Sequence, residues 1–225
     1  MRKLEVGAPS QNPIIIVGCG PVGTRILRNI VRLSPETAVI AYGDEPWEPY
    51  DRVKLVSLIV GDLAWADLPN LPQLPENHNV SINSNNRIVA IDRANCTVTD
   101  SNGNKQKYSK LILATGSKPW VPDIPGVDLC GVHTFRNPGD VRSILENEYT
   151  GRRTVILGGG LLGIELACGL RKKGEQVCIV VSGRLLGRQL DERAAELLKM
   201  HLLALGIEII FGRASAIVGS ADQDR

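Results

Sequence analysis

The sequence predicts an α/β fold made of two tandem units that open in the same way. Near the start of the chain a β-branched run, Ile14–Val17, leads into a glycine-rich turn and then into a stretch compatible with a helix to about Leu33. The same order returns in the second half, where Val155–Leu157 precedes another glycine-rich turn and a helix to about Lys173. A buried strand, a tight turn and a helix in this order are the first part of a βαβ unit, whose strands run parallel.

The first unit contains further strand signals. Ser34-Pro35 ends the helix, and Ala38–Tyr42 is predicted as the second parallel strand. Val53–Leu74 has mixed character and is interpreted as a surface excursion with some helix. Leu111–Ala114 is predicted as a third parallel strand. Three short alternating segments separated by Asn- and Gly-rich turns predict a small antiparallel meander: Val80–Ile82, Arg87–Asp92 and Thr97–Thr99.

The second unit repeats the pattern after a proline-rich connection. We place the crossing in this connection, which gives domains of residues 1–118 and 119–225. Val177–Val181 and Ile207–Phe211 are the next predicted strands, and Asp191–Leu205 between them is predicted as a helix. The side chains expected on the mostly apolar face of that helix are Ala194, Leu197, Leu198, His201, Leu202 and Leu205.

Composition excludes several classes of protein. The chain is 43% hydrophobic and 22% charged, an ordinary globular balance, with a net charge of only +2. With no basic field and only 3 Trp, 4 Tyr and 2 Phe, neither nucleic acid nor an anionic membrane is expected as a partner. The longest charge-free stretches are too short to span a bilayer. The five cysteines have no metal-site or disulfide spacing, which predicts a cytoplasmic protein without a metal site.

Each glycine-rich turn has the G-x-G-x-x-G spacing of a dinucleotide-binding Rossmann turn. The first consists of Gly18, Gly20 and Gly23, and the second of Gly158, Gly160 and Gly163. In such turns the first glycine permits the tight turn, the second lets the backbone approach a pyrophosphate, and the third lets helix and strand pack closely. The alternative interpretation is that these glycines serve only as βα turns.

A dinucleotide site also requires a group that reads the ribose, about 20 residues beyond the turn. In the first unit Glu45 stands there, although it is also interpretable as a solvated loop acid. In the second unit Val181 and Ser182 occupy the corresponding place and neither is acidic, while Arg184 and Arg188 follow. Neutral residues beside arginine favour a 2′-phosphate, but solvated surface arginines explain the pattern equally well, so the choice between NAD and NADP stays open.

An ordered set of motifs resembles the FAD-dependent pyridine nucleotide–disulfide oxidoreductase superfamily, over about Pro13 to Gly212. Within it the chain is most similar to ferredoxin and rubredoxin reductases and to the large subunit of NAD(P)H nitrite reductase. The motifs that carry the resemblance are G-x-G-P-x-G at Gly18–Gly23, E-P-x-x-P-Y-D-R at Glu45–Arg52, L-I-L-A-T-G-S at Leu111–Ser117, I-P-G at Ile124–Gly126 and G-G-G-x-x-G-I-E at Gly158–Glu165.

The resemblance implies two cofactors, FAD in the first unit and NAD(P)H in the second. The residues implied at the FAD site are Gly18, Gly20, Pro21, Val22, Gly23, Glu45, Arg52, Lys54, Ile88, Ala114, Thr115 and Gly116. Those implied at the NAD(P)H site are Gly158, Gly160, Leu161, Leu162, Gly163, Glu165 and Ser182. The implied reaction is transfer of a hydride from NAD(P)H to FAD and of electrons onward, which requires no catalytic acid or base from the protein.

The chain departs from the family pattern in three places. Ser57 stands where ferredoxin-reductase-like members often have a flavin-proximal Lys, which favours the nitrite-reductase side and leaves Lys54 as a substitute. No Cys-x4-Cys follows the first unit, so dithiol exchange is not expected. Family members also continue well beyond the equivalent of Arg225, and the chain is therefore interpreted as truncated.

Two alternatives to an active flavoenzyme follow from that last departure. One is that the chain is a non-catalytic nucleotide-binding fragment; the other is that it is one subunit of a split flavoenzyme that a second chain completes. The electron acceptor is not encoded in these residues. The acceptors that the resemblance implies are a ferredoxin, a rubredoxin, a sirohaem module or oxygen.

Overall fold

The computed structural model describes residues 12–69, 79–146 and 153–219. The chain divides into two compact units: unit 1 comprises Met1–Arg52 and Ala66–Ser117, and unit 2 comprises Val53–Trp65 and Lys118–Arg225. The excursion expected over Val53–Leu74 contains the short helices η1 (Arg52–Lys54), α2 (Leu55–Val60) and η2 (Trp65–Asp67). Residues 70–74 of that stretch lie outside the described part of the chain.

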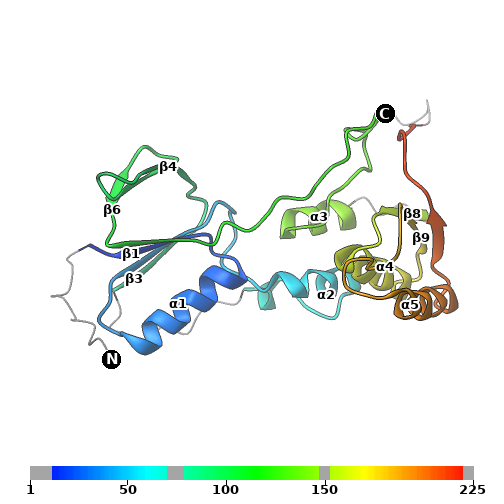
Figure 1. Cartoon of the computed structure of the whole chain (residues 1–225), viewed down its shortest axis with the longest axis horizontal. Helices are drawn as coiled ribbons and strands as arrows, with labels where there is room; N and C mark the ends of the chain where they lie inside the picture. Colours follow the sequence, from blue (N-terminus) through cyan, green and yellow to red (C-terminus); the bar gives the residue numbers. More distant parts are fainter. Residues whose placement is uncertain (1–11, 70–78, 147–152, 220–225) are drawn as a thin grey trace. The chain divides into compact units, whose positions relative to one another are not determined.

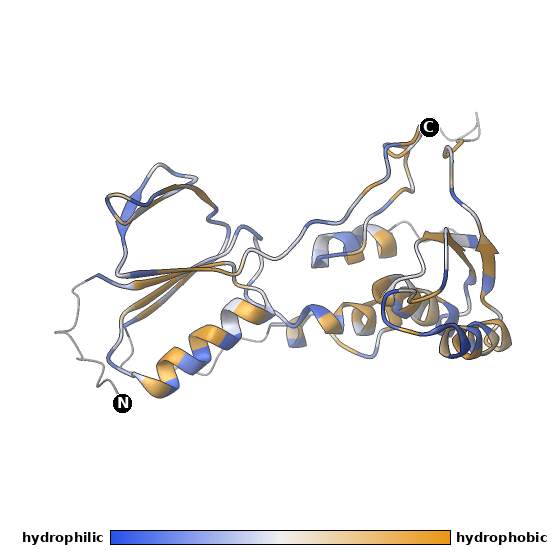
Figure 2. Cartoon of the chain, viewed as in Figure 1, coloured by the Kyte–Doolittle hydropathy of each residue, from blue (hydrophilic) through white to orange (hydrophobic). Residues whose placement is uncertain are grey.

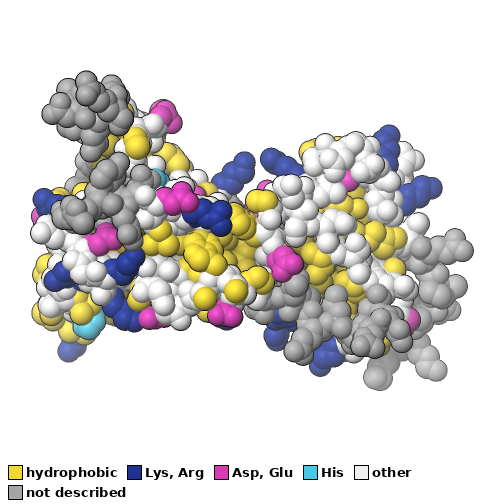
Figure 3. All heavy atoms as spheres, turned by 180° about the vertical axis from the view of Figure 1, so that it is seen from behind, with side chains coloured by type: hydrophobic (Ala, Val, Ile, Leu, Met, Phe, Trp, Pro, Cys, Tyr) yellow, Lys and Arg dark blue, Asp and Glu magenta, His cyan; other side chains and the backbone are white. Residues whose placement is uncertain are grey.

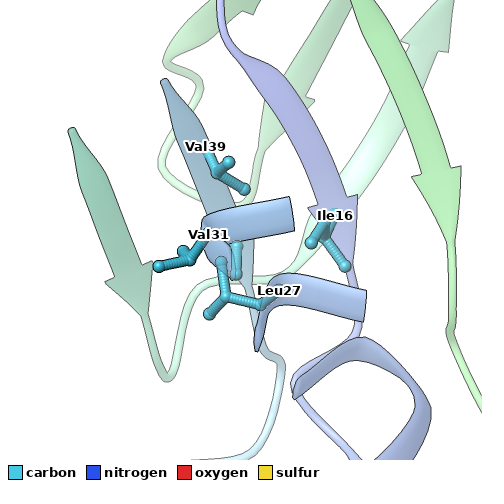
Figure 4. Packing of buried hydrophobic residues seen from close by; sticks show 5 residues of the cluster. Ile16, Leu27, Val31 and Val39 are labelled. Atoms are coloured by element: carbon cyan, nitrogen blue, oxygen red, sulfur yellow. The ribbon is translucent and has the colours of Figure 1, made fainter. Parts of the chain in front are cut away.

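Unit 1 is built on a four-stranded parallel sheet in the order β3-β2-β1-β7 (Figure 1). The strands are β1 (Ile14–Val17), β2 (Val39–Tyr42), β3 (Val80–Asn83) and β7 (Lys110–Leu113). Helix α1 (Pro21–Leu33) connects β1 to β2 and alternates hydrophobic and hydrophilic residues along its length (Figure 2). Its buried Leu27 and Val31 are one helical turn apart and pack on Ile16 of β1 and Val39 of β2 (Figure 4).

Two sequence expectations for unit 1 were wrong. Val80–Ile82 does not belong to the meander: β3 pairs parallel with β2, so the sheet has four strands rather than three. Val80 and Ile82 pack on the core beneath α1, and alternation alone does not distinguish an edge strand of a parallel sheet from a hairpin strand. The meander instead consists of β4 (Ile88–Asp92), β5 (Thr97–Asp100) and β6 (Lys105–Lys107), of which β6 was not predicted because its residues are polar.

Unit 2 contains a three-stranded parallel sheet in the order β10-β9-β8, as expected. Its strands are β8 (Arg153–Leu157), β9 (Gln176–Val181) and β10 (Glu208–Phe211). Helix α4 (Leu161–Lys172) connects β8 to β9, and α5 (Glu192–Ala204) connects β9 to β10. Helix α3 (Pro138–Glu146) was not predicted, and the carboxylate of Asp140 accepts hydrogen bonds from the N–H groups of Arg136 and Asn137 at its start.

Helix α2 packs on α4 within unit 2 although it comes from the excursion early in the chain. Gly169 of α4 makes room for it, since a β-carbon there would come closer than 3.0 Å to a methyl group of Val56. Lys172 and Asp62 form an ion pair of 2.8 Å across the same contact.

The apolar face expected for α5 is only partly buried. Of the expected residues, Leu202 is fully buried, whereas Leu197 is 57% exposed and Leu205 is 43% exposed; Ala195, which was not expected on this face, is buried. Apolar side chains at the edges of the sheet, among them Val155 and Phe211, are also exposed. Seen from behind, unit 2 presents hydrophobic side chains on its surface (Figure 3). The periodicity of α5 therefore predicted the helix correctly but not which of its apolar residues the core would cover.

Candidate functional site

The first glycine turn lies at the carboxyl end of β1. Gly18 has φ +114, a conformation that favours glycine, and its N–H donates to the Tyr42 carbonyl oxygen at 2.7 Å. A β-carbon on Gly23 would come closer than 3.0 Å to the carbonyl oxygen of Gly18, so the third glycine allows α1 to pack against the turn. A β-carbon on Gly20 would have no atom within 4 Å. The backbone at Gly20 is therefore accessible to a ligand.

The N-terminus of α1 has the properties of an anion site. Its cap residue, Gly20, offers no side-chain acceptor, and the first turn has no acidic residue. Helix N-termini expose unpaired N–H groups and carry partial positive charge, which attract phosphate. Pro21 and Val22 begin the helix and are exposed, Val22 by 62%. By contrast, the carboxylate of Asp191 caps α5 by accepting from Ala194 N–H at 2.8 Å.

The segment Ala114–Gly116 lies against this turn. The N–H of Ala114 donates to the Val17 carbonyl oxygen at 2.7 Å. A β-carbon on Gly18 would come closer than 3.0 Å to the carbonyl oxygen of Ala114. The backbone nitrogen of Thr115 would lie 3.1 Å from the same β-carbon. Gly116 has φ +67, which lets the chain turn away immediately afterwards. Two segments about 95 residues apart in sequence thus meet at one edge of the sheet, where open α/β sheets bind ligands.

Glu45 is at the centre of a polar cluster just after β2. Tyr50 donates its hydroxyl to Oε2 at 2.7 Å, and Arg52 donates from Nη2 to Oε1 at 2.6 Å. The Arg52 guanidinium also lies 5.1 Å from the centre of the Tyr50 ring. The sequence singled out Glu45 and Arg52 but not Tyr50, although Tyr50 belongs to the same motif. Spacing in the sequence did not show that the three side chains form one hydrogen-bonded group.

Two further residues expected at the first site occupy different surroundings. Ile88, for which the resemblance implies that the backbone faces adenine, opens β4. Its side chain is half-buried against the cluster of Ile15, Tyr42 and Val98 and belongs to the core, which does not test the role of its backbone. Lys54 is exposed at the start of α2, and belongs to unit 2 rather than unit 1.

The second glycine turn has the same local geometry as the first. Gly158 has φ +127 and donates its N–H to the Val180 carbonyl oxygen at 2.9 Å. A β-carbon on Gly163 would come closer than 3.0 Å to the Gly158 carbonyl oxygen, whereas one on Gly160 would meet nothing within 4 Å. Gly160 caps α4 without a side-chain acceptor or an acidic first turn. The exposed Leu161 and Leu162 follow, and Glu165 is half-buried one turn further along α4.

The loop after β9 is attached to this turn. Leu186 donates its N–H to the Gly159 carbonyl oxygen at 2.8 Å, and a β-carbon on Gly159 would contact Val181 and Leu185. Ser182 is exposed at the end of β9, and Arg184 is exposed two residues further. The structure therefore brings the neutral strand end and the second turn together. Nothing in the sequence indicated the hydrogen bond from Leu186 to Gly159, for which Leu186 adopts a backbone φ of +46.

Cys19, inside the first glycine turn, is not a reactive thiol. Burial, and secondarily the negative charge of Asp44, raise its pKa to about 11. Its sulfur packs at Gly43, where a β-carbon would lie 3.3 Å from Sγ.

We expect Cys19 to be alkylated at least about ten times more slowly than the exposed Cys96 and Cys130 in the native protein. At pH 8 its thiolate fraction is on the order of one in a thousand, and only the thiolate reacts. Iodoacetamide labelling followed by peptide mass mapping measures the rates, and labelling in urea is the control in which all five cysteines should react. Equal native labelling of Cys19 and Cys96 would contradict the expectation.

The fold and these turns define a class of protein. Each unit has a parallel sheet whose first strand leads through a glycine turn into a helix with an uncapped N-terminus. This arrangement is that of an α/β protein resembling the FAD- and NAD-binding domains of reductases. In the described part of the chain, no three or more His, Cys, Asp and Glu side chains gather as metal ligands would. None of its described helices has both the length and the apolar character needed to cross a bilayer.

The chain belongs to the pyridine nucleotide–disulphide oxidoreductase family, whose model matches residues 12–224. The family resemblance inferred from the motifs is thereby confirmed. The chain is 33% identical over 210 residues to a nitrite reductase [NAD(P)H] of Bacillus subtilis, covering 92% of this chain and 26% of that protein.

Solved structures show the same fold. The covalent putidaredoxin reductase–putidaredoxin complex superposes with a TM-score of 0.87 at 22% identity, over 95% of this chain and 53% of the other. NADH:rubredoxin oxidoreductase from Clostridium acetobutylicum superposes with a TM-score of 0.77 at 27% identity, over 92% of this chain and 58% of the other. The chain therefore spans about a quarter of that nitrite reductase and about half of these reductases.

Proposed function

We propose that this chain is the nucleotide-binding part of a flavin-dependent oxidoreductase that takes a hydride from NAD(P)H. Unit 1 binds FAD and unit 2 binds NAD(P)H, in two tandem Rossmann-like domains. The observation that carries the proposal is the pair of glycine-capped helix N-termini, each with an open approach to the backbone, at Gly20 and Gly160. Both fit a pyrophosphate, because a phosphate oxygen requires free N–H groups and no β-carbon in its path.

The protein residues bind and orient the nucleotides. The first glycine turn and the Ala114–Gly116 segment hold the FAD pyrophosphate, while Glu45 accepts from the ribose hydroxyls. The second turn holds the NAD(P)H pyrophosphate, and Glu165 lies further along the same helix toward the nicotinamide end. When bound, FAD supplies a ring system that accepts a hydride and passes electrons on one or two at a time. The acceptor is a redox protein, as the names of the putidaredoxin and rubredoxin reductases suggest, or a sirohaem module, as the motif resemblance implies. The proposed location is the cytoplasm.

Reconstitution tests this function. The purified chain is incubated with FAD, freed of unbound flavin and examined for the flavin absorbance bands. NADH or NADPH is then added without oxygen. Retained flavin that loses its colour on addition of nucleotide supports the proposal, and failure to bind either cofactor contradicts it.

A second candidate is that the chain binds nucleotides but needs further polypeptide to retain or reduce flavin. The chain covers about half of the reductase structures, and this candidate is compatible with that coverage. Nucleotide binding without retained flavin, and flavin retention on co-expression with a second chain, would identify it. Flavin that the isolated chain retains and that NADH or NADPH reduces would exclude it.

We expect the wild-type chain to bind NADPH at least as tightly as NADH. The end of β9 presents Ser182 rather than an acid, so no carboxylate repels a 2′-phosphate there, and Arg184 follows close behind. Ser182→Glu should shift the ratio of the two dissociation constants toward NADH by about tenfold. Ser182→Gln is the matched neutral control and should leave the ratio unchanged. Fluorescence titration measures both constants, and a wild-type preference for NADH unaltered by Ser182→Glu would show that this strand end does not read the ribose.

A further inference from the structure

We propose that Tyr50 is a positioning residue, which together with Arg52 fixes the Glu45 carboxylate in the orientation that accepts a ribose diol. The inference rests on the proposed function of unit 1, and assigns a role to a side chain for which the glycine turns and the ribose acid do not account. It starts from the two hydrogen bonds on Glu45, one on each carboxylate oxygen.

The number of acceptor positions on Glu45 matches this role. An ionised carboxylate offers about four lone-pair positions, two on each oxygen. Tyr50 uses one on Oε2 and Arg52 uses one on Oε1. One position on each oxygen remains, and the two adjacent hydroxyls of a ribose require two neighbouring acceptors. Both present partners are donors, so the carboxylate stays an acceptor toward a third group.

The exposed fractions of the three side chains show which of them are held inside the protein and which can reach a ligand. Tyr50 is 7% exposed and the Arg52 side chain 17%, whereas the Glu45 side chain is 32% exposed. Tyr50 and Arg52 are therefore mostly buried, and their hydrogen bonds reach the Glu45 carboxylate from the protein side, leaving its other side accessible to solvent. Arg52 stacks on the Tyr50 ring, which limits the movement of both donors.

The backbone around the cluster is fixed on both sides. Asn85, after β3, donates its N–H to the Glu45 carbonyl oxygen at 2.9 Å. Tyr50 forms an isolated bridge with Pro69. A glutamate held in one rotamer loses less side-chain entropy when a ligand binds than a freely rotating one, which favours affinity. The exposed neighbour Asp44 has no such hydrogen bonds from Tyr50 or Arg52, so charge near the ribose does not by itself reproduce the arrangement.

Tyr50→Phe tests the role, because it removes the hydroxyl and keeps the ring. We expect the dissociation constant for FAD to rise by about tenfold in this variant, the usual effect of one hydrogen bond to a charged group. In a Glu45→Ala background, Tyr50→Phe should change the dissociation constant for FAD by less than about twofold, since the carboxylate that Tyr50 orients is absent. Tyr108, whose side chain packs on the cluster of Ile15, Tyr42 and Val98, provides the matched control Tyr108→Phe.

The diol dependence separates positioning from a merely structural role. ADP and 2′,3′-dideoxy-ADP are titrated against wild type and Tyr50→Phe, with thermal unfolding measured for each protein. In wild type ADP should bind about ten times more tightly or better, and in Tyr50→Phe this preference should fall to about twofold. If Tyr50→Phe weakens the binding of ADP and of 2′,3′-dideoxy-ADP equally, or keeps the wild-type preference for ADP, the role of Tyr50 is overturned. Unit 1 would still be a nucleotide site. Wild-type protein that binds neither ADP nor FAD overturns the proposed function and this inference together.

Discussion

Gly20→Val is expected to abolish FAD retention while leaving unit 1 folded. The backbone of Gly20 has φ −74 and ψ −172, an extended conformation that valine adopts readily, and a β-carbon there meets no atom within 4 Å. The branched side chain would instead fill the space over the N-terminus of α1 where the pyrophosphate is proposed to lie. Losing two charge-assisted hydrogen bonds weakens binding by about two orders of magnitude or more. Flavin content after purification and FAD titration measure the effect.

The second turn supplies the matched control for this prediction. Gly160 has φ −83 and ψ 174, and it too has no atom near a hypothetical β-carbon. Gly160→Val should therefore abolish NAD(P)H binding and preserve FAD binding, and Gly20→Val should do the reverse. If both variants retain FAD, the assignment of the first turn is wrong. If each loses both ligands while remaining folded, the two turns do not serve separate nucleotides.

Gly23→Ala is expected to destabilise unit 1 strongly, although it adds only one methyl group. The new β-carbon would come closer than 3.0 Å to both the carbonyl oxygen and the carbonyl carbon of Gly18. Backbone atoms cannot rotate away as a side-chain end does, so α1 must move off the sheet or the turn must open. We expect a loss of about 3–5 kcal/mol in the free energy of unfolding, near the upper limit for one substitution.

Urea unfolding of Gly23→Ala and Gly20→Ala compares one methyl group added at two positions of the same turn. Gly20→Ala should cost less than about 1 kcal/mol, since it changes only a helix cap whose β-carbon would meet no atom within 4 Å. Equal midpoints for the two variants would show that α1 does not pack against Gly18 in solution.

Much of the fold was predictable because it depends on local patterns. The β-branched run before Gly18 and the equivalent run before Gly158 identified both βα turns, and the strands found in unit 2 agree with expectation to within two residues. Hydrophobic runs and glycine positions are properties of neighbouring residues, which a single sequence displays directly. The partner of Val80–Ile82 was predicted incorrectly because pairing is chosen between distant segments.

In the candidate site, too, local spacing predicted some features and only the folded structure showed others. Spacing indicated Glu45, but the hydroxyl of Tyr50 and the guanidinium of Arg52 reach it only because the loop after β2 turns back on itself. The motif spacing assigned different roles to Gly20 and Gly23, and the structure shows their different surroundings. The first faces open space and the second faces the backbone of Gly18, so one is available to a ligand and the other to the packing of α1.

The sequence by itself determined the class of fold, the position of both glycine turns and the family to which the chain belongs. These follow from residue type and spacing, since only glycine avoids the steric cost of φ +114 at Gly18 or of close packing at Gly23. Tertiary structure alone decided that β3 joins the parallel sheet, that α2 packs on α4 and that Glu45 is held by two donors. Each of these depends on contacts between segments that are distant in the chain or folded back on one another, and the free energy of such contacts is set by three-dimensional packing rather than by local propensity.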